Sequence, residues 1–226
     1  SLSRKSIAPM LAGWPEEMWK DDCVERIKYI VLGLLLPISF GILRYMINGG
    51  DYFKNEILLI SMATLYLWYS FRYARKTNLE ELEIPTKKII GQFLVTFLIS
   101  QLFYYTGIQF LQIQSDSSAS FAENISHGYS LSLMLSVSVI SPIEEELFLR
   151  GFVQKGGFRN SWLGIFLTSS FFSLLHVPND ALSFIYYALS GFIYGTSYKY
   201  SKTLWVPILC HIGHNTIIVV RSFFYT

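Results

Sequence analysis

The sequence predicts an all-α fold, a polytopic bundle of about seven membrane-spanning helices, with six to eight spans possible for its length. Hydrophobic residues make up 52% of the 226 residues and charged residues only 15%, against roughly 25% in an average soluble domain. Long apolar runs alternate with polar connections, and no ten-residue alternating pattern typical of barrel strands occurs. Because backbone groups in hydrocarbon need internal partners, the spans should be helices, some of them broken or short around a polar cavity.

A single integral membrane domain is expected over residues 1–226. Residues 1–25 form a polar, interfacial leader, 26–128 hold the first three spans, and 129–220 hold a motif-bearing core. The predicted spans lie at about 27–47, 57–71, 89–111, from 129 through the acidic motif, 162–176, 181–198 and 204–220. A serine-rich loop is expected at 114–128, and the short second and fifth segments could be re-entrant.

The distribution of basic residues predicts the orientation. With a cytoplasmic N-terminus, 15 of the 18 lysines and arginines fall on inner segments. This positive-inside bias favours seven crossings of the cell membrane with the N-terminus in the cytoplasm. The net charge of +2, without a basic stripe or a glycine-rich phosphate loop, argues against a nucleic-acid partner. Nothing in the sequence specifies an oligomeric state.

An acidic motif follows the fourth apolar stretch. Ser141 precedes Pro142 and Glu144 in the pattern of a capping box, so we expect a helix to start there. In this interpretation the apolar stretch breaks near Ile140, and Glu144 is a structural cap rather than a catalytic group.

Ionisable groups at membrane depth are costly, so a chain that keeps several usually uses them. Glu146 and Arg150 lie one helical turn apart, which predicts an ion pair that supports the site. Glu145 projects about 100° away from Glu146 and is free to act as a reactive carboxylate. The alternative is a purely structural cluster of charges.

Two further segments carry polar side chains. His176 precedes Val177-Pro178, so its helix should end there with the ring facing a cavity, or simply at the membrane interface. His211 and Asn215 share a helix face and could donate hydrogen bonds to an oxyanion, or could join neighbouring helices. His214 is expected to point elsewhere as a packing residue.

Cysteine chemistry is not expected. Cys23 and Cys210 suggest neither a disulfide framework nor a four-cysteine zinc site. Cys210 and its neighbour His211 do not face each other on a helix, so Cys210 is expected to be a small packing residue rather than a nucleophile.

The three motifs, in this order, resemble those of the CAAX prenyl protease and bacteriocin-processing (CPBP) family. They are Glu145-Glu146 with Arg150, Phe172 with His176, and His211 with Asn215. The resemblance covers about residues 129–220. It implies an intramembrane endopeptidase that needs no cofactor and acts on a membrane-associated peptide or protein, such as a prenylated tail or a leader peptide. The compactness of the chain favours a bacterial source.

The resemblance also implies a role for each motif residue. Glu145 would be the general base for a water molecule, which His176 would help to hold. His211 and Asn215 would stabilise the tetrahedral intermediate, and Glu146 with Arg150 would support the site.

Three alternatives stay open. Glu145, His176 and His211 could hold zinc, although the chain has no His-Glu-x-x-His motif. The chain could instead be a non-catalytic scaffold or immunity protein that binds a partner peptide or kinase. A small proton-coupled transporter ranks last, because no inverted repeat is visible.

The site also imposes a condition on the fold. In a straight seven-span arrangement His176 falls toward the outer side, whereas Glu145 and His211 lie inward of the midplane. The predicted site therefore assembles only if the fifth segment is short, tilted or re-entrant.

Overall fold

The computed structural model describes residues 16–48, 55–76, 87–113, 115–128 and 130–225. These residues are mainly helical, with one isolated antiparallel bridge between Ser115 and Pro178. The elements in chain order are α2 (Glu16–Asn48), α3 (Glu56–Lys76), α4 (Lys87–Thr106), η2 (Gly107–Leu111), α5 (Asp116–Ser126), α6 (Leu131–Leu135), η3 (Ser136–Ile140), α7 (Ser141–Glu146), η4 (Leu147–Gly157), α8 (Trp162–Leu175), α9 (Ala181–Ser201) and α10 (Trp205–Tyr225). The η segments are π-helical. The predicted all-α class is confirmed for the described part of the chain.

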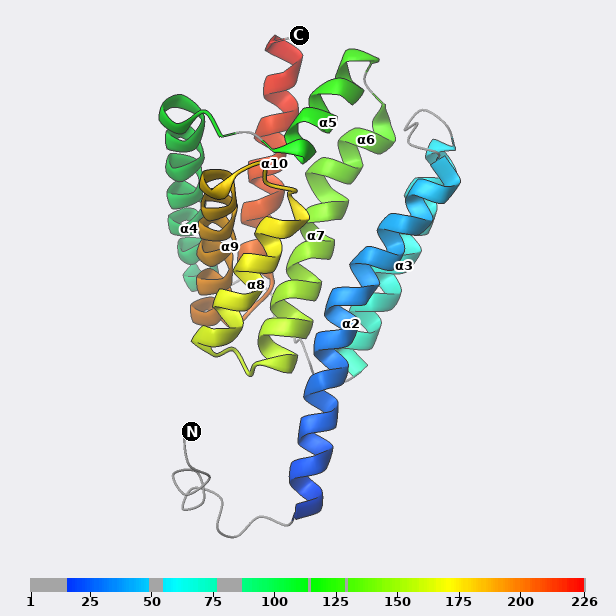
Figure 1. Cartoon of the computed structure of the whole chain (residues 1–226), viewed down its shortest axis with the longest axis vertical. Helices are drawn as coiled ribbons and strands as arrows, with labels where there is room; N and C mark the ends of the chain where they lie inside the picture. Colours follow the sequence, from blue (N-terminus) through cyan, green and yellow to red (C-terminus); the bar gives the residue numbers. More distant parts are fainter. Residues whose placement is uncertain (1–15, 49–54, 77–86, 114, 129, 226) are drawn as a thin grey trace.

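The helices form a bundle with a two-helix flank. Figure 1 shows α2 and α3 side by side along one edge, with α4, α8, α9, α10 and the α6–η4 helix forming the rest, and α5 at the end nearest the C-terminus. The α2 helix packs closely on η4. A Cβ atom at Gly33 would lie 2.5 Å from Val153 Cγ2 and 3.0 Å from the Phe148 carbonyl oxygen. The flank therefore supports the helix that carries the acidic motif.

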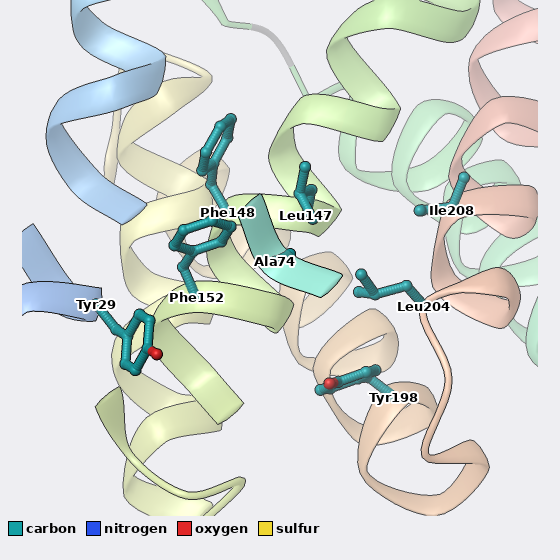
Figure 2. Packing of buried hydrophobic residues seen from close by; sticks show 8 residues of the cluster. All are labelled: Tyr29, Ala74, Leu147, Phe148, Phe152, Tyr198, Leu204 and Ile208. Carbon is teal, nitrogen blue, oxygen red and sulfur yellow. The ribbon is translucent and has the colours of Figure 1, made fainter. Parts of the chain in front are cut away.

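A buried apolar cluster anchors the helix that carries the acidic motif. Its eight residues are Tyr29, Ala74, Leu147, Phe148, Phe152, Tyr198, Leu204 and Ile208 (Figure 2). The Phe148 and Phe152 rings lie 5.3 Å apart between centroids, and Tyr73 stacks on Phe152 at 5.9 Å. Aromatic pairs at these distances add to the stabilisation from apolar burial. The cluster joins α2, α3, η4 and α9 to the start of α10.

A second cluster lies nearer the polar motifs and comprises Ile89, Leu149, Phe172, Tyr194, Val206 and Cys210. The Cys210 side chain is buried, and its Sγ atom lies 3.5 Å from the carbonyl oxygen of Phe93. The expected packing role of Cys210 agrees with this position.

The outer surface is apolar, as expected for a helical membrane protein. Large apolar side chains such as Leu98 on α4 and Phe166 on α8 are 67% and 64% exposed. Among the described residues, two helical stretches, Lys87–Leu111 and Trp205–Phe224, are long and apolar enough to cross a bilayer, and α8 is apolar but only 14 residues long. Contiguous exposed apolar surface marks contact with lipid or protein. The fold is thus that of a helical membrane protein, and the number of crossings remains a prediction.

The serine-rich segment is helical, which corrects the predicted loop. The Ser115 side chain accepts a hydrogen bond from the Ser118 backbone N–H, and the Ser118 side chain accepts one from the Ser115 backbone N–H, forming a capping box at the start of α5. Ile125 on the same helix is buried. Local capping and the burial of an apolar residue together overcome the low helix propensity of serine.

The helix break predicted near Ile140 is wrong, because the chain is helical without interruption from Leu131 to Gly157. Ser141 has helical angles, φ −61° and ψ −45°, and its N–H donates to the Ser136 carbonyl in an i→i+5 bond. Ser141 and Glu144 therefore do not form a capping box. A π-helical turn widens the helix just before Pro142, so the proline is accommodated without a new helix start.

The leader is only partly described. The α2 helix begins at Glu16 and runs through the predicted first span, so residues 16–25 are helical rather than a separate segment. Residues 1–15 lie outside the described part of the chain.

Candidate active site

A cavity of about 600 Å³ lies between α4, α5, α8, α9, α10 and the α6–α7 helix. Glu145, His176, His211 and Asn215 all line it. Aromatic side chains form much of its wall: Phe103, Tyr104, Phe172, Tyr186, Tyr187 and Tyr194. Serine side chains of α5 and its cap line another part: Ser115, Ser117, Ser118 and Ser120. The structure thus brings together the four residues predicted to act, although they come from three separate sequence segments.

Glu145 lines this cavity, and one of its carboxylate oxygens has no partner among the described residues. This atom, Oε2, is buried. A buried carboxylate oxygen without a hydrogen-bond partner is costly, and such groups occur at catalytic sites. Glu144, one position earlier, is buried but does not line the cavity. The two adjacent glutamates therefore differ in what they face.

His176 ends α8, as the following Val177-Pro178 predicts. Its Nδ1 atom lies 2.8 Å from the Phe172 carbonyl oxygen, which can only accept, so Nδ1 carries the proton. In the neutral ring Nε2 is then a hydrogen-bond acceptor. The ring stacks on Tyr187 with centroids 4.5 Å apart. Because α8 has only 14 residues, His176 reaches the cavity, and the condition that the sequence imposed on the fifth segment is met.

The predicted ion pair between Glu146 and Arg150 is confirmed. Arg150 Nε lies 2.9 Å from Glu146 Oε2, and both side chains are fully buried. Arg150 Nη1 also donates to Thr168 Oγ1 at 3.0 Å, which ties the acidic motif to α8. Buried charges of this kind need both pairing and further hydrogen bonds.

The other carboxylate oxygen of Glu146 contacts His211. The His211 Nδ1 atom lies 3.0 Å from Glu146 Oε1, so Nδ1–H donates to the carboxylate. The imidazole also stacks on Tyr194, with centroids 5.0 Å apart. Spacing alone could not show this contact, because the two residues are 65 positions apart. The carboxylate fixes the ring's orientation, as in a catalytic Asp–His pair.

Phe172 is central to the site, a role that the sequence did not predict beyond its place in a motif. Its ring centroid lies 4.5 Å from that of His176 and 5.6 Å from that of His211. The Arg150 guanidinium lies 5.7 Å from the same ring. Phe172 therefore separates the three polar groups with an apolar surface and contacts each of them.

On α10, His214 differs from expectation, and Asn215 makes the contact between helices that was the second of its two predicted roles. His214, expected to point away from the site, lines the cavity, and its Nδ1 lies 3.2 Å from Gln101 Nε2 on α4. Asn215 lines the cavity as expected, but its Nδ2 atom donates to the backbone carbonyl of Val137 at 2.9 Å. Both side chains already have protein partners on neighbouring helices.

The described side chains do not fit a metal centre. Within the described ranges, no group of three or more His, Cys, Asp and Glu residues is close enough to hold a metal ion. The arrangement therefore offers no ready zinc site of the two-histidine, one-carboxylate type.

Comparison with known proteins supports a peptidase. The family described as "Type II CAAX prenyl endopeptidase Rce1-like" matches residues 127–217, a range that contains all three motifs. A protein of Bacillus subtilis (strain 168) named "Putative membrane peptidase YdiL" is 29% identical over 93 residues. The aligned part covers 40% of this chain and 37% of that relative. No solved structure gives a significant match.

Proposed function

From the confirmed resemblance of residues 127–217 to Rce1-like CAAX prenyl endopeptidases, we propose that this membrane protein is an intramembrane endopeptidase. It hydrolyses a peptide bond in a membrane-associated peptide or protein, of the prenylated or leader type, through a water molecule activated by Glu145. The observation that carries this proposal is the shared cavity, in which residues of three motifs surround one space.

The proposed reaction begins with a water between Glu145 and His176. The Glu145 carboxylate takes a proton from this water, and the acceptor Nε2 of His176 helps to orient it. The water oxygen bonds to the carbonyl carbon of the scissile peptide, giving a tetrahedral intermediate. Glu145 then passes the proton to the leaving nitrogen as the carbon–nitrogen bond breaks.

His211 serves the developing oxyanion. When its ring carries both protons, Nδ1–H stays on Glu146 and Nε2–H is available to the oxyanion. The Glu146 carboxylate stabilises this imidazolium, and Arg150 balances the charge of Glu146. These side chains suffice for the steps without a metal ion. The aromatic wall would receive apolar parts of the substrate.

In the membrane we propose the predicted topology, multi-pass with a cytoplasmic N-terminus, in contact with lipid around the apolar outer surface.

The decisive experiment compares Glu145→Gln with wild type in detergent or nanodiscs. The substrates are matched membrane peptides with and without a prenyl group, and a proteomic comparison in cells searches for an uncleaved membrane-proximal peptide. General acid–base catalysis is worth about 10²–10⁴ in rate, so the variant should lose at least about a hundredfold in kcat.

Glu144→Gln is the matched control. It makes the same change one residue away, outside the cavity, and should retain cleavage. If Glu145→Gln folds and still cleaves, or keeps the full cellular phenotype, the peptidase proposal is wrong. Retention of the phenotype without cleavage would favour a scaffold or immunity protein.

A further inference from the structure

The contact between Asn215 and Val137 lies at an irregular point of the helix that carries Glu145. In a regular α-helix the Val137 carbonyl would accept from the N–H of residue 141. Ser141 instead donates its N–H to Ser136, one residue further back. In π-helical register the next N–H would come from residue 142, which is Pro142 and has none.

The Val137 carbonyl is thus the acceptor that the proline and the π turn together leave without a backbone donor. Asn215 supplies a substitute, because its Nδ2 atom donates to this oxygen at 2.9 Å from α10. A buried carbonyl without a donor is strongly disfavoured, so a substitute donor is expected. The Asn215 amide therefore replaces the missing backbone hydrogen bond.

We propose that Asn215 is a positioning residue, which clamps the π turn before Pro142 and so holds Glu145 in the cavity. Glu145 follows Pro142 by three residues, about one helical turn, so the register of the π turn decides where its carboxylate points. The catalytic part of this inference rests on the proposed function, whereas the clamp itself does not. In this proposal the Asn215 N–H that binds the Val137 carbonyl stabilises the helix and does not contact the oxyanion.

The test is a double-mutant cycle between Asn215→Ala and Pro142→Ala. Alanine at position 142 restores a backbone N–H that can reach Val137, so the helix no longer needs the amide. In the native background Asn215→Ala should lower kcat by about tenfold, the scale of one hydrogen bond. In the Pro142→Ala background it should change kcat by no more than about twofold. An equal loss in both backgrounds would overturn the clamp in favour of direct contact with the intermediate.

A second readout needs no activity. The same four proteins are compared by thermal unfolding and by hydrogen exchange of the amides that follow Pro142. The clamp predicts that Asn215→Ala lowers the unfolding midpoint and speeds exchange there, and that Pro142→Ala suppresses both effects. The clamp is refuted if the two substitutions change the unfolding midpoint additively and Asn215→Ala leaves hydrogen exchange unchanged. If neither the wild type nor any variant cleaves a peptide, the proposed function fails. The unfolding and exchange measurements still show whether Asn215 and Pro142 are coupled.

Two variants complete the design. Asn215→Asp keeps the side chain's size but replaces the donating amide, so it should behave like Asn215→Ala. It serves as the substitute variant if Asn215→Ala does not fold. Thr216→Ala changes the next residue, which is exposed on the outer face of α10, and should leave the midpoint, the exchange and kcat as in wild type.

Discussion

The Nδ1 atom of His211 lies 3.0 Å from Oε1 of Glu146, so the third motif is hydrogen-bonded directly to the first. The same carboxylate receives Arg150 Nε on its other oxygen at 2.9 Å. Glu146 is therefore shared between a fixed cation on its own helix and an imidazole on α10. The packing of α7 against α10 therefore depends on the Glu146 carboxylate.

Replacing Glu146 with glutamine should destabilise the protein and slow the reaction. The amide can no longer balance the buried Arg150 charge, and breaking such a pair costs about 3–5 kcal/mol. The His211 ring would lose its carboxylate, so kcat should fall even where the variant folds. Thermal unfolding and single-turnover cleavage measure the two effects. Glu123→Gln, an exposed glutamate on α5, is the control, and equal midpoints for the two variants would contradict this account.

Sequence reasoning succeeded where a local rule applied. The spacing of Glu146 and Arg150 predicted their ion pair, and Pro178 predicted the end of the helix at His176. The shared helix face placed His211 and Asn215 on one cavity. Each of these depends on the geometry of a single helix, which the sequence specifies directly.

Sequence reasoning failed where a partner from a distant helix determines the local structure. Ser141 and Pro142 give the pattern of a helix start, yet the chain continues through a π turn whose open carbonyl is filled by Asn215, 78 positions away. The helix at Asp116–Ser126 likewise depends on burial of Ile125. The Glu146–His211 hydrogen bond likewise joins residues that lie far apart in the sequence. Only the three-dimensional packing reveals these contacts.

Complete removal of zinc should leave peptide cleavage unchanged. The proposed steps use Glu145, His176 and His211 alone, and the described side chains are not grouped as metal ligands. Chelator-treated protein, with its metal content measured directly, should cleave at the untreated rate. Loss of activity on treatment, with recovery on adding zinc alone, would restore the metallopeptidase alternative.

Asp180 should stabilise α9 in a pH-dependent way. Its Oδ1 atom accepts the Ser183 N–H at 2.7 Å, and hydrogen bonds from the Ser183 backbone and side chain lower the pKa of this exposed carboxyl. Its contribution is therefore present above the unfolded-state pKa and is lost as the pH falls through the lowered folded-state pKa. Asp180→Ala should reduce the unfolding midpoint at neutral pH, and the difference from wild type should narrow in acid. A difference that is constant with pH would show that the cap does not act through its charge.

Gly191 allows α8 and α9 to approach closely beside the site. A Cβ atom there would lie 3.0 Å from Ser169 Cα and 3.1 Å from Phe172 Cβ. Because one of these atoms is backbone, Gly191→Ala should push the helices apart at a cost of about 1–3 kcal/mol. It should also lower kcat, since Phe172 contacts both His176 and His211.

The matched control for that change is Gly41→Ala on α2, where a Cβ atom would meet nothing within 4 Å. In a helix interior this substitution is worth about 0.5–1 kcal/mol in the stabilising direction. The two variants should therefore shift the unfolding midpoint in opposite directions, and only Gly191→Ala should slow cleavage. Equal midpoints would mean that α8 and α9 can separate freely, and a normal kcat in a destabilised Gly191→Ala would show that the Phe172 position does not control the histidines.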